Sequence, residues 1–599
     1  MLFKNKTYHC VANQTGRWSV EMDPAQAGGP FNLSIKSSDD QVSFSDVLIG
    51  DVWLCSGQSN MVLDFNNQRM RELYAKDIAG SQNDQIRQVL VQRSVSSAPV
   101  AEFKTTGWQK AGPGTLSAFS AAAYFFAREL HEKYKVPVGL INSSWGGTKI
   151  EAWMSTDAIQ AFPQFEKQVS LIQDSLQVAA KTRQRIELIA DWHAKNRTQD
   201  KGYLNGQAIW AGLLFDDHSW KTVQAPVLFD QFGFNNTFGV IWFRKEIEVP
   251  ENLAGKQAIV KLARVDDEDE TFLNGVRIGG YANRERAREH VVPVNLVKAG
   301  KNVITVRIIN FNGPGGFSGG APISLDFGNV QIPLEGTWKY QQGRAAGEIP
   351  GGYNAQELAT SIYNGMIAPL IPYAIKGAIW YQGENNSTRG KEYRELLPAM
   401  IADWRLKWGG RDFPFIIQQL VNYRDTAALP AESDWAELRE AQSMTVSVSP
   451  NTAMAVGIDI GEAGTIHPVN KLDIGRRLAL GARKVAYGEK HLVACGPVYK
   501  SMKVLDGKVL LRFSETGRGL AVRNGQELKY FAVAGSDRKF HWAIAKISGG
   551  LVEVSCKDVP DPVAVRYAWA DNPAGCNLIN KEGLPASPFR TDDWPRPAK

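Results

Sequence analysis

The sequence predicts an α/β fold that is interrupted by an all-β insertion. Short apolar runs typical of buried strands recur along the chain, at 51–56, 138–142, 378–381, 415–420 and 453–458. Helical patterns lie among these runs, and strands that alternate with helices form parallel sheets with both faces covered. From about Gly206 to Leu334 the pattern changes to period-two alternation with Asn-Gly and Gly-Pro turns. That change predicts an inserted β domain of the sandwich type.

The clearest predicted helix lies in the first half of the α/β region. Apolar side chains recur at helical spacing from Ser120 to Tyr134, and Pro137 marks the end of the pattern before the next apolar strand. That strand runs into two glycines, Gly146 and Gly147. A second helix is predicted to begin near Asn470.

The chain length indicates several folding units, because 599 residues exceed what one hydrophobic core usually organises. The predicted α/β domain comprises residues 47–205 and 336–490, separated by the inserted β domain at 206–335. Residues 1–46 and 491–599 are both strand-like. We expect them to pack together as one terminal β-sandwich, since neither piece is long enough to be stable alone.

Composition and charge exclude several classes of partner. The formal net charge of +6 is spread without a basic run, so we expect no nucleic-acid partner. No stretch approaches the eighteen or more apolar residues of a membrane span, so no membrane insertion is expected. Oligomeric state stays open. The cysteines lie far apart in no metal-ligand spacing, so they predict no metal site: Cys10, Cys55, Cys495, Cys556 and Cys576.

The first residues bear on localisation. The segment Met1–Lys6 lacks the apolar core of a signal peptide. The strand-like segments at 16–22 and 27–35 nevertheless look like strands from the middle of a sandwich, with no earlier strands before them. An export signal could have been lost with such strands. We expect a secreted or periplasmic protein.

Ser59 is the most informative residue of the sequence. It follows the apolar strand 51–56 directly, within Gly57-Gln-Ser-Asn. A strand that stops at a Gly-x-Ser turn leaves the serine oxygen at the carboxyl edge of an α/β sheet, where ligands bind. Because serine and asparagine are also ordinary turn formers, a polar loop is the alternative interpretation.

A serine nucleophile needs a base, and His467 is the best candidate among the eight histidines. It follows the strand at 453–458 by a short loop and precedes the helix predicted near Asn470. We therefore expect it on the same carboxyl edge as Ser59. The other histidines fall in the β regions or on polar helical faces.

Acyl transfer passes through an oxyanion that preorganised donors must stabilise. Gly146 and Gly147 come at a strand end, where glycine lets a backbone N–H approach a substrate oxygen closely. Gln382 offers a side-chain amide at the end of another strand. The alternative interpretation is that the two glycines form a tight turn and that Gln382 is a solvated loop residue.

Four segments together resemble the sialate O-acetylesterase family of SGNH hydrolases, which includes acetylxylan esterase-like members: Gly57–Met61, Ser144–Trp153, Trp380–Asn385 and Ile466–Lys471. The resemblance covers nearly the whole chain. It implies a flavodoxin-like, three-layer hydrolase domain, an inserted galactose-binding-like jelly roll, and removal of O-acetyl groups from sialic acids, xylan or related glycans.

Carried over by position, the family pattern makes Ser59 the nucleophile with its own N–H in the oxyanion hole. Gly146 or Gly147 becomes the second donor, Gln382 the third, and His467 the base. The family mechanism implies an acetyl-enzyme intermediate, an acetylated oligosaccharide or polysaccharide substrate, and no cofactor.

The acid of the triad is less defined. Many SGNH enzymes place an aspartate three residues before the histidine, but this sequence has Gly464 there. Asp459, at the end of the preceding strand, is the first candidate and Glu462 the second. A Ser-His dyad held by a backbone carbonyl is the third possibility.

Substrate contacts are expected at the same edge of the sheet. Trp145 and Glu384 are the candidates, with Trp153 and Tyr381 as further ones, and packing is the alternative role for each. The acidic run Asp266–Glu270 has the chemistry of a calcium site, but a solvated turn is the simpler interpretation.

Two other functions fit parts of the sequence. One is a non-catalytic carbohydrate-binding protein on a hydrolase scaffold, against which the complete set of nucleophile, base and oxyanion positions argues. The other is a peptidase or lipase with the same serine chemistry. The sequence shows no obvious apolar lid of the lipase kind.

Overall fold

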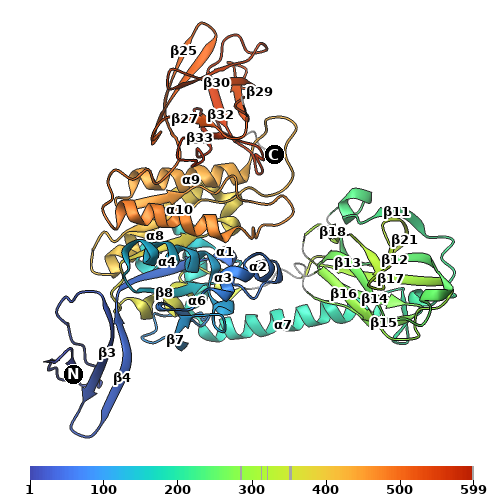
Figure 1. Cartoon of the computed structure of the whole chain (residues 1–599), viewed down its shortest axis with the longest axis horizontal. Helices are drawn as coiled ribbons and strands as arrows, with labels where there is room; N and C mark the ends of the chain where they lie inside the picture. Colours follow the sequence, from blue (N-terminus) through green and yellow to red (C-terminus); the bar gives the residue numbers. More distant parts are fainter. Residues whose placement is uncertain are drawn as a thin grey trace. The chain divides into compact units, whose positions relative to one another are not determined.

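The computed structural model describes residues 1–235, 237–282, 287–311, 313–319, 322–349, 354–525 and 527–595. The unit formed by residues 1–175 and 355–599 contains a seven-stranded sheet in the order β24-β23-β22-β5-β8-β6-β7, of which β7 and β8 are labelled in Figure 1. Its strands are β5 (Asp51–Gly57), β6 (Asn83–Val91), β7 (Thr105–Ala111), β8 (Val138–Ser144), β22 (Gly377–Tyr381), β23 (Phe415–Gln418) and β24 (Thr452–Ala455). All neighbouring strands are parallel except β6 and β7. The predicted α/β class is therefore confirmed.

Five of the parallel strands have the flavodoxin-like order that the resemblance implied. Taken in chain order, β5, β8, β22, β23 and β24 are arranged 2-1-3-4-5 in the sheet. Strands β6 and β7 extend the sheet beyond β8, because β6 pairs with β8 and β7 pairs with β6. Strand β5 lies between β8 and β22, at the point where the strand order reverses. Ligands of open α/β sheets bind at such a point.

Two layers of helices cover the sheet because successive strand residues face opposite sides. In β5, Trp53 and Cys55 join one buried cluster and Leu54 joins the other. The helices α4 (Ala121–Tyr134) and α10 (Lys471–Val485) contribute to the first cluster, and α8 (Gly390–Lys407) and α9 (Asp434–Val448) to the second. This is the three-layer arrangement that the alternating pattern predicted.

Side-chain caps fix the starts of the two predicted helices. Ser120 accepts a hydrogen bond from the backbone N–H of Ala123 at the start of α4. Asn470 accepts one from the N–H of Asp473 at the start of α10. Both are residue types that favour this position because the side-chain oxygen satisfies a free N–H of the first turn.

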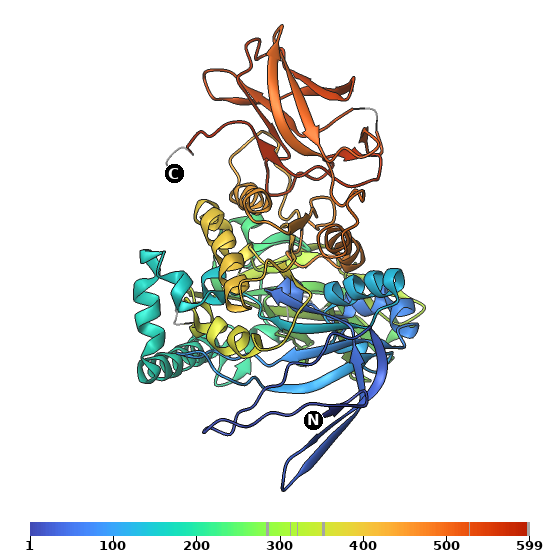
Figure 2. The ribbon, with the colours of Figure 1, turned by 90° about the vertical axis from the view of Figure 1, so that its left-hand side faces the viewer.

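The two terminal regions do not form one sandwich, contrary to the prediction. The N-terminal strands β1 (Leu2–Phe3), β2 (Lys6–Thr7), β3 (Gly28–Lys36) and β4 (Gln41–Ile49) make a sheet of their own. Figures 1 and 2 show this sheet and the C-terminal strands at opposite sides of the α/β sheet. The reason is local: β4 leads directly into the amino end of β5, whereas the C-terminal region shares a buried cluster with Val456 and Ile458, beyond β24.

Residues after about 491 form antiparallel sheets around that one apolar cluster. One sheet contains β25 (Val498–Leu505), β26 (Lys508–Ser514), β30 (Ile544–Ser548) and β31 (Leu551–Ser555); another contains β28 (Phe531–Ala534), β29 (Phe540–Trp542), β32 (Ala564–Tyr567) and β34 (Phe589–Arg590); a pair contains β27 (Leu520–Val522) and β33 (Leu578–Asn580).

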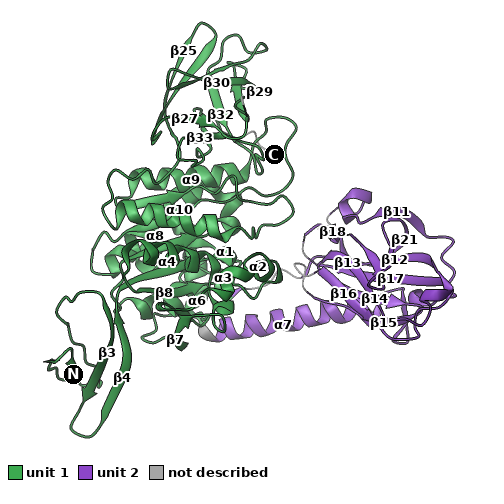
Figure 3. Ribbon diagram, viewed as in Figure 1, with its two compact units in different colours: residues 1–175, 355–599 green, residues 176–354 purple. Residues whose placement is uncertain are grey.

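The inserted unit is larger than predicted. It spans Leu176–Asn354 (Figure 3), because most of α7 (Ser175–Thr198) lies within it and β21 (Gly336–Ala346) pairs with β11 and β12. The sequence pattern at 336–346 is that of an ordinary strand, so it carries no sign of the sheet it joins.

Two antiparallel sheets enclose an apolar cluster in this unit. One contains β11 (Lys221–Ala225), β12 (Phe238–Val249), β14 (Glu268–Leu273), β15 (Val276–Gly279), β17 (Gly300–Asn310) and β21; the other contains β13 (Ala258–Asp266), β16 (Ala287–Val292), β18 (Gly316–Gly319), β19 (Ser324–Asp326) and β20 (Gln331–Pro333). The jelly-roll name for this unit stays a prediction.

Candidate active site

The turn after β5 presents Ser59. Gly57 has φ +134°, and a Cβ built on it would lie 2.1 Å from the carbonyl oxygen of Tyr381 on the neighbouring strand β22. Only glycine fits this position. The N–H of Gln58 then donates to the same carbonyl at 2.9 Å, and Ser59 begins the short helix α1 (Ser59–Val62). The Gly-x-Ser turn is thus fixed against the edge of the next strand.

His467 meets Ser59 across the fold. Its Nε2 lies 2.9 Å from the Ser59 Oγ, although the two residues are 408 positions apart in the sequence. The loop that carries His467 is held by hydrogen bonds of its own: the N–H of His467 donates to Thr465 Oγ1 at 3.1 Å, and the N–H of Val469 donates to Glu462 Oε1 at 3.0 Å. The structure therefore brings together the predicted nucleophile and base.

The glycines after β8 lie beside the serine. A Cβ built on Gly146 would lie 3.2 Å from the Cβ of Ser59, so the absence of a side chain lets this backbone approach the serine closely. Trp145 fixes the start of the turn by donating its N–H to the Gly57 carbonyl at 3.0 Å. The side-chain amide of Asn385 holds the end of this turn by donating to the Gly147 carbonyl at 2.7 Å.

Gln382 does not fit its expected role as a third oxyanion donor. Its side chain is fully buried, and its Nε2 donates to the Thr148 carbonyl at 3.1 Å and to Asn386 Oδ1 at 2.7 Å. Its Oε1 accepts from the Tyr393 hydroxyl at 2.8 Å. Both amide hydrogens are therefore used inside the protein, where they connect the ends of β8 and β22.

Asp459 does not fit its expected role as the acid of the triad. Its carboxylate is bonded to Arg477 at 2.5 Å and forms an ion pair with Arg523. Burial disfavours the ionised form, but the two arginines outweigh it and hold the pKa of Asp459 below its usual range. Asp459 thus connects α10 to the C-terminal β region. Glu462, the second candidate, pairs with Arg69 and accepts from Val469 in the His467 loop.

The two expected substrate contacts differ in their surroundings. Trp145 is half-buried at the end of β8, and the guanidinium of the exposed Arg93 lies 5.9 Å from its ring centroid. Glu384 is buried, with 8% of its surface exposed, and its Oε1 accepts from Asn60 Nδ2 at 2.6 Å. A carboxylate so enclosed is not a surface contact for a sugar. Of the further candidates, Trp153 and Tyr381 are fully buried core residues.

Sequence reasoning missed two residues that lie directly behind Ser59. Asn60 and Lys471 are both fully buried, and Lys471 Nζ donates to Asn60 Oδ1 at 2.6 Å. Burial lowers the pKa of Lys471 to about 7, against the opposing effect of Glu384 and Glu462. Burial also raises the pKa of Glu384, and the bond from Asn60 and the charges of His467 and Lys471 oppose that rise. No local pattern marked either residue, because their partners come from other segments of the chain. Without such partners a buried lysine would be costly, so the sequence alone offered no reason to expect one here.

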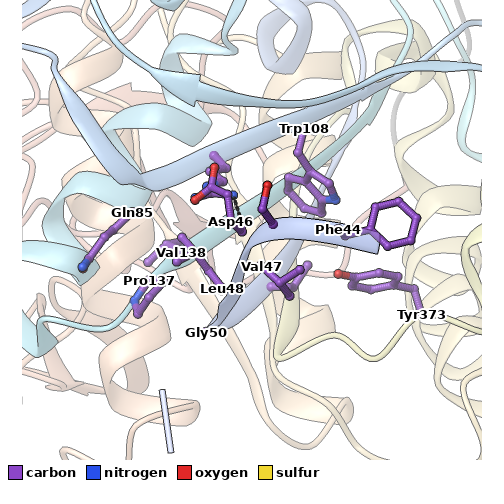
Figure 4. Close-up of a pocket in the computed structure, with 14 residues that line it drawn as sticks. Phe44, Asp46, Val47, Leu48, Gly50, Gln85, Trp108, Pro137, Val138 and Tyr373 are labelled. Carbon is purple, nitrogen blue, oxygen red and sulfur yellow. Dashed lines mark hydrogen bonds and ion pairs between the residues drawn. The ribbon is translucent and has the colours of Figure 1, made fainter. Parts of the chain in front are cut away.

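A surface pocket of about 440 Å³ lies elsewhere (Figure 4). Phe44, Trp108 and Tyr373 lie along one side of it, and Pro137 and Val138 contribute to the opposite side. Because Val138 is the first residue of β8 and Ser144 the last, this pocket is at the amino edge of the sheet. Ser59 and His467 are at the carboxyl edge, so the pocket is not part of the candidate active site.

The acidic run Asp266–Glu270 is engaged within the inserted unit. Asp269 pairs with Arg288 at 2.7 Å, and Glu270 pairs with Arg307 at 2.9 Å. Among the described residues, no group of three or more His, Cys, Asp or Glu side chains is arranged to hold a metal ion. The described cysteines are all free thiols, and no described helix is long and apolar enough to span a membrane.

Comparisons with known proteins identify relatives of the whole chain. Residues 49–184 and 349–480, the two halves of the α/β domain, match the model of the carbohydrate esterase, sialic acid-specific acetylesterase family. The sialate O-acetylesterases of Mus musculus and Homo sapiens are each 25% identical over 97% of this chain and 85% and 83% of theirs.

A solved relative extends the match. The crystal structure of a carbohydrate acetylesterase from Xanthomonas citri is 30% identical, with a TM-score of 0.63, over 99% of this chain and 92% of that one. The match covers nearly the full length of both chains. The chain therefore belongs to the carbohydrate esterase family of sialic acid-specific acetylesterases.

Proposed function

We propose that this carbohydrate O-acetylesterase works through a serine nucleophile, Ser59, and a histidine base, His467. The observation that carries the proposal is the 2.9 Å contact between His467 Nε2 and Ser59 Oγ at the carboxyl edge of the sheet. Two residues so far apart in sequence meet there because β5 and the loop before α10 end at the same edge. This is the hydrogen-bonded pair that activates a hydroxyl for acyl transfer.

The reaction has two halves. His467 Nε2 accepts the Ser59 proton while the serine oxygen attacks the acetyl carbonyl, and the imidazolium then gives that proton to the departing sugar oxygen. A water next attacks the acetyl-enzyme, losing its proton to the same nitrogen, and the collapse of the second tetrahedral species returns the proton to Ser59 and releases acetate.

The oxyanion of both tetrahedral species needs donors. We assign the N–H groups of Ser59 and Gly146 to this role, because the two backbones are adjacent and Gly146 has no side chain to separate them. Gly147 stays a candidate for a further donor. One such donor typically contributes about 3–4 kcal/mol to the transition state.

A negative charge near the imidazolium also supports the mechanism. We assign it to Glu384 instead of Asp459, because the Asn60 amide links Glu384 to the carbonyl of Ile466, next to His467, whereas Asp459 is bonded to two arginines. Opposite charges stabilise each other strongly in a buried site. Glu384 is thus a supporting charge and not a substrate contact.

Acetylated sialic acids and acetylated xylan are both candidate substrates, since each presents the same acetyl ester. Arg93 favours a sugar that bears a carboxylate, because its guanidinium lies at the carboxyl edge, over the ring of Trp145.

Acetate release from O-acetylated sialic acid and from acetyl-xylan, measured with wild type and Arg93→Ala, distinguishes the two candidate substrates. Arg93→Ala should lose about tenfold or more in kcat/KM on the sialic acid only; an equal effect on both would refute the role of Arg93.

Labelling with a fluorophosphonate tests the serine mechanism. Wild type should be labelled, and Ser59→Ala should be neither labelled nor active. Ser144→Ala is the matched control, because this buried serine ends the neighbouring strand β8 and donates to Asn142 within that strand. Labelling that persists in Ser59→Ala would refute the serine mechanism. Unlabelled wild-type protein that still binds acetylated glycans would favour the non-catalytic alternative.

A further inference from the structure

One buried amide joins three segments behind the reacting pair. Asn60 follows Ser59 directly, and its Nδ2 donates to Glu384 Oε1 at 2.6 Å and to the Ile466 carbonyl at 2.9 Å. Its Oδ1 accepts from Lys471 Nζ at 2.6 Å. Ile466 immediately precedes His467. The amide therefore connects the serine turn, the loop after β22 and the histidine loop.

Lys471 determines which way this amide faces. An ammonium group only donates hydrogen bonds, so the oxygen of Asn60 must point toward Lys471 and its NH₂ toward Glu384 and Ile466. The reversed amide would place an oxygen against a carboxylate and a carbonyl. Lys471 is itself enclosed: it is fully buried at the start of α10, with its Nζ 5.1 Å from the ring centroid of Tyr381.

Keeping a lysine at this position is costly, because burial opposes its charge. Glu384, Glu462 and the Asn60 oxygen are the groups that compensate it. A purely structural core position of this size would be occupied more favourably by an apolar side chain. The arrangement thus has a cost in stability that positioning of the reacting pair explains.

We propose that Asn60 and Lys471 are positioning residues for ester hydrolysis: Lys471 orients the Asn60 amide, and that amide holds Ser59 and His467 at hydrogen-bonding distance. Neither residue is assigned contact with the substrate. The inference rests on the proposed serine mechanism, since it specifies what keeps that pair aligned. Misplacement by about 1 Å in such a pair can reduce the rate about 100-fold.

The test begins with Asn60→Asp. The substituted carboxylate keeps an acceptor for Lys471 but faces Glu384 and the Ile466 carbonyl with an oxygen, so the link to both is lost. We expect kcat to fall about 100-fold, with KM within about threefold, and the fluorophosphonate labelling rate to fall in parallel with kcat. Asn580→Asp is the matched control, because Asn580 is equally buried and joins three segments in the C-terminal region. It should keep wild-type kcat.

A double variant reverses the polarity of the hydrogen bond between positions 60 and 384. In Asn60→Asp with Glu384→Gln, the glutamine amide donates where the carboxylate accepted, and the negative charge is retained at position 60. We expect at least about a tenfold recovery in kcat over Asn60→Asp alone. If Asn60 served only stability, the double variant would recover the melting temperature of wild type but not its kcat, and the positioning role would be refuted.

Lys471→Met provides a second test that does not bury a new charge and is therefore expected to fold. It should reduce kcat at least about tenfold, with KM little changed, while Lys484→Met, which removes an ion pair with Glu515 from the same helix, should not. If Asn60→Asp and Lys471→Met keep kcat within about twofold while Ser59→Ala is inactive, the positioning role is refuted and the serine mechanism stands. If Ser59→Ala itself is active, the proposed function fails first.

Discussion

At the level of single residues, the site depends on positions such as Gly57 and Gly146, where an added Cβ atom would press against the neighbouring backbone or side chain. Ser59 could be predicted because a Gly-x-Ser turn after an apolar strand is a local pattern. Asn60 and Lys471 belong to the same short segments as Ser59 and His467, yet their burial depends on which strands become neighbours. Sequence reasoning named the segments and missed the contacts within them.

Gly57→Ala should disrupt the serine turn. The added Cβ would lie 2.1 Å from the Tyr381 carbonyl, at a φ of +134° that other residues rarely adopt. We expect a loss of at least about 2 kcal/mol in the free energy of unfolding and a fall in kcat. Urea unfolding and acetate release measure the two. Gly464→Ala, in the His467 loop with no atom within 4 Å of the added Cβ, is the control and should behave as wild type.

Lys471 should make stability depend on pH in an unusual direction. Its pKa is about 7 in the folded state and near 10.5 when unfolded, so the unfolded chain binds more protons between these values. Wild type should therefore gain stability, relative to Lys471→Met, as pH rises from about 7 to about 9, by up to about 2 kcal/mol. Below the folded-state pKa the cost of the buried charge is fully present. A stability difference between the two proteins that does not change with pH would refute a depressed pKa.

At the scale of elements, the site is made by three neighbouring strand ends. The strands β8, β5 and β22 place Gly146, Ser59 and Gln382 at one edge. The strands and helices themselves were predictable, because apolar runs, helical spacing and caps such as Ser120 and Asn470 are local. The family resemblance implied the order of β8, β5, β22, β23 and β24, but not the addition of β6 and β7 beyond β8, since strand pairing leaves no trace in local pattern.

The corrected roles of Gln382 and Asp459 have the same origin. Each has a side chain suited to catalysis and lies at the expected edge, but a distant partner takes it. Gln382 donates to the carbonyl of Thr148, 234 positions away in the sequence, and Arg523 from the C-terminal region holds Asp459. Such partners are decided by tertiary packing, which composition and spacing do not encode.

Asp459→Asn should separate stability from catalysis. The substitution leaves Arg477 and Arg523 beside a neutral group in a mostly buried site. We expect a loss of about 3 kcal/mol in the free energy of unfolding, because breaking a buried ion pair leaves uncompensated charge. Under conditions where the protein is folded, kcat should stay within about threefold of the wild-type value. If kcat instead fell by about 100-fold or more, Asp459 would be restored as the acid of the triad.

At the scale of the whole molecule, the chain consists of two compact units. Residues 176–354 have buried clusters of their own, separate from those of the α/β and terminal regions. The insertion could be predicted from its change of pattern, but its limits could not, because β21 and α7 resemble ordinary elements of either unit. Secretion or periplasmic localisation stays a prediction.

Separate cores predict separate unfolding. Differential scanning calorimetry of the full chain should show more than one transition, with a van't Hoff enthalpy below the calorimetric enthalpy. Ile308 lies fully buried in the inserted unit, so Ile308→Ala should lower one transition and leave the other in place. A single transition that shifts as a whole would show that the two units unfold together.

In the proposed mechanism, Ser59 forms a covalent acetyl-enzyme with the help of His467. The most direct measurement is mass spectrometry of peptides from enzyme quenched during turnover of an activated acetyl ester. We predict one acetyl group on the peptide that contains Ser59, formed far more slowly in His467→Ala. An acetyl group on another residue, or none in an enzyme that still releases acetate, would contradict this mechanism.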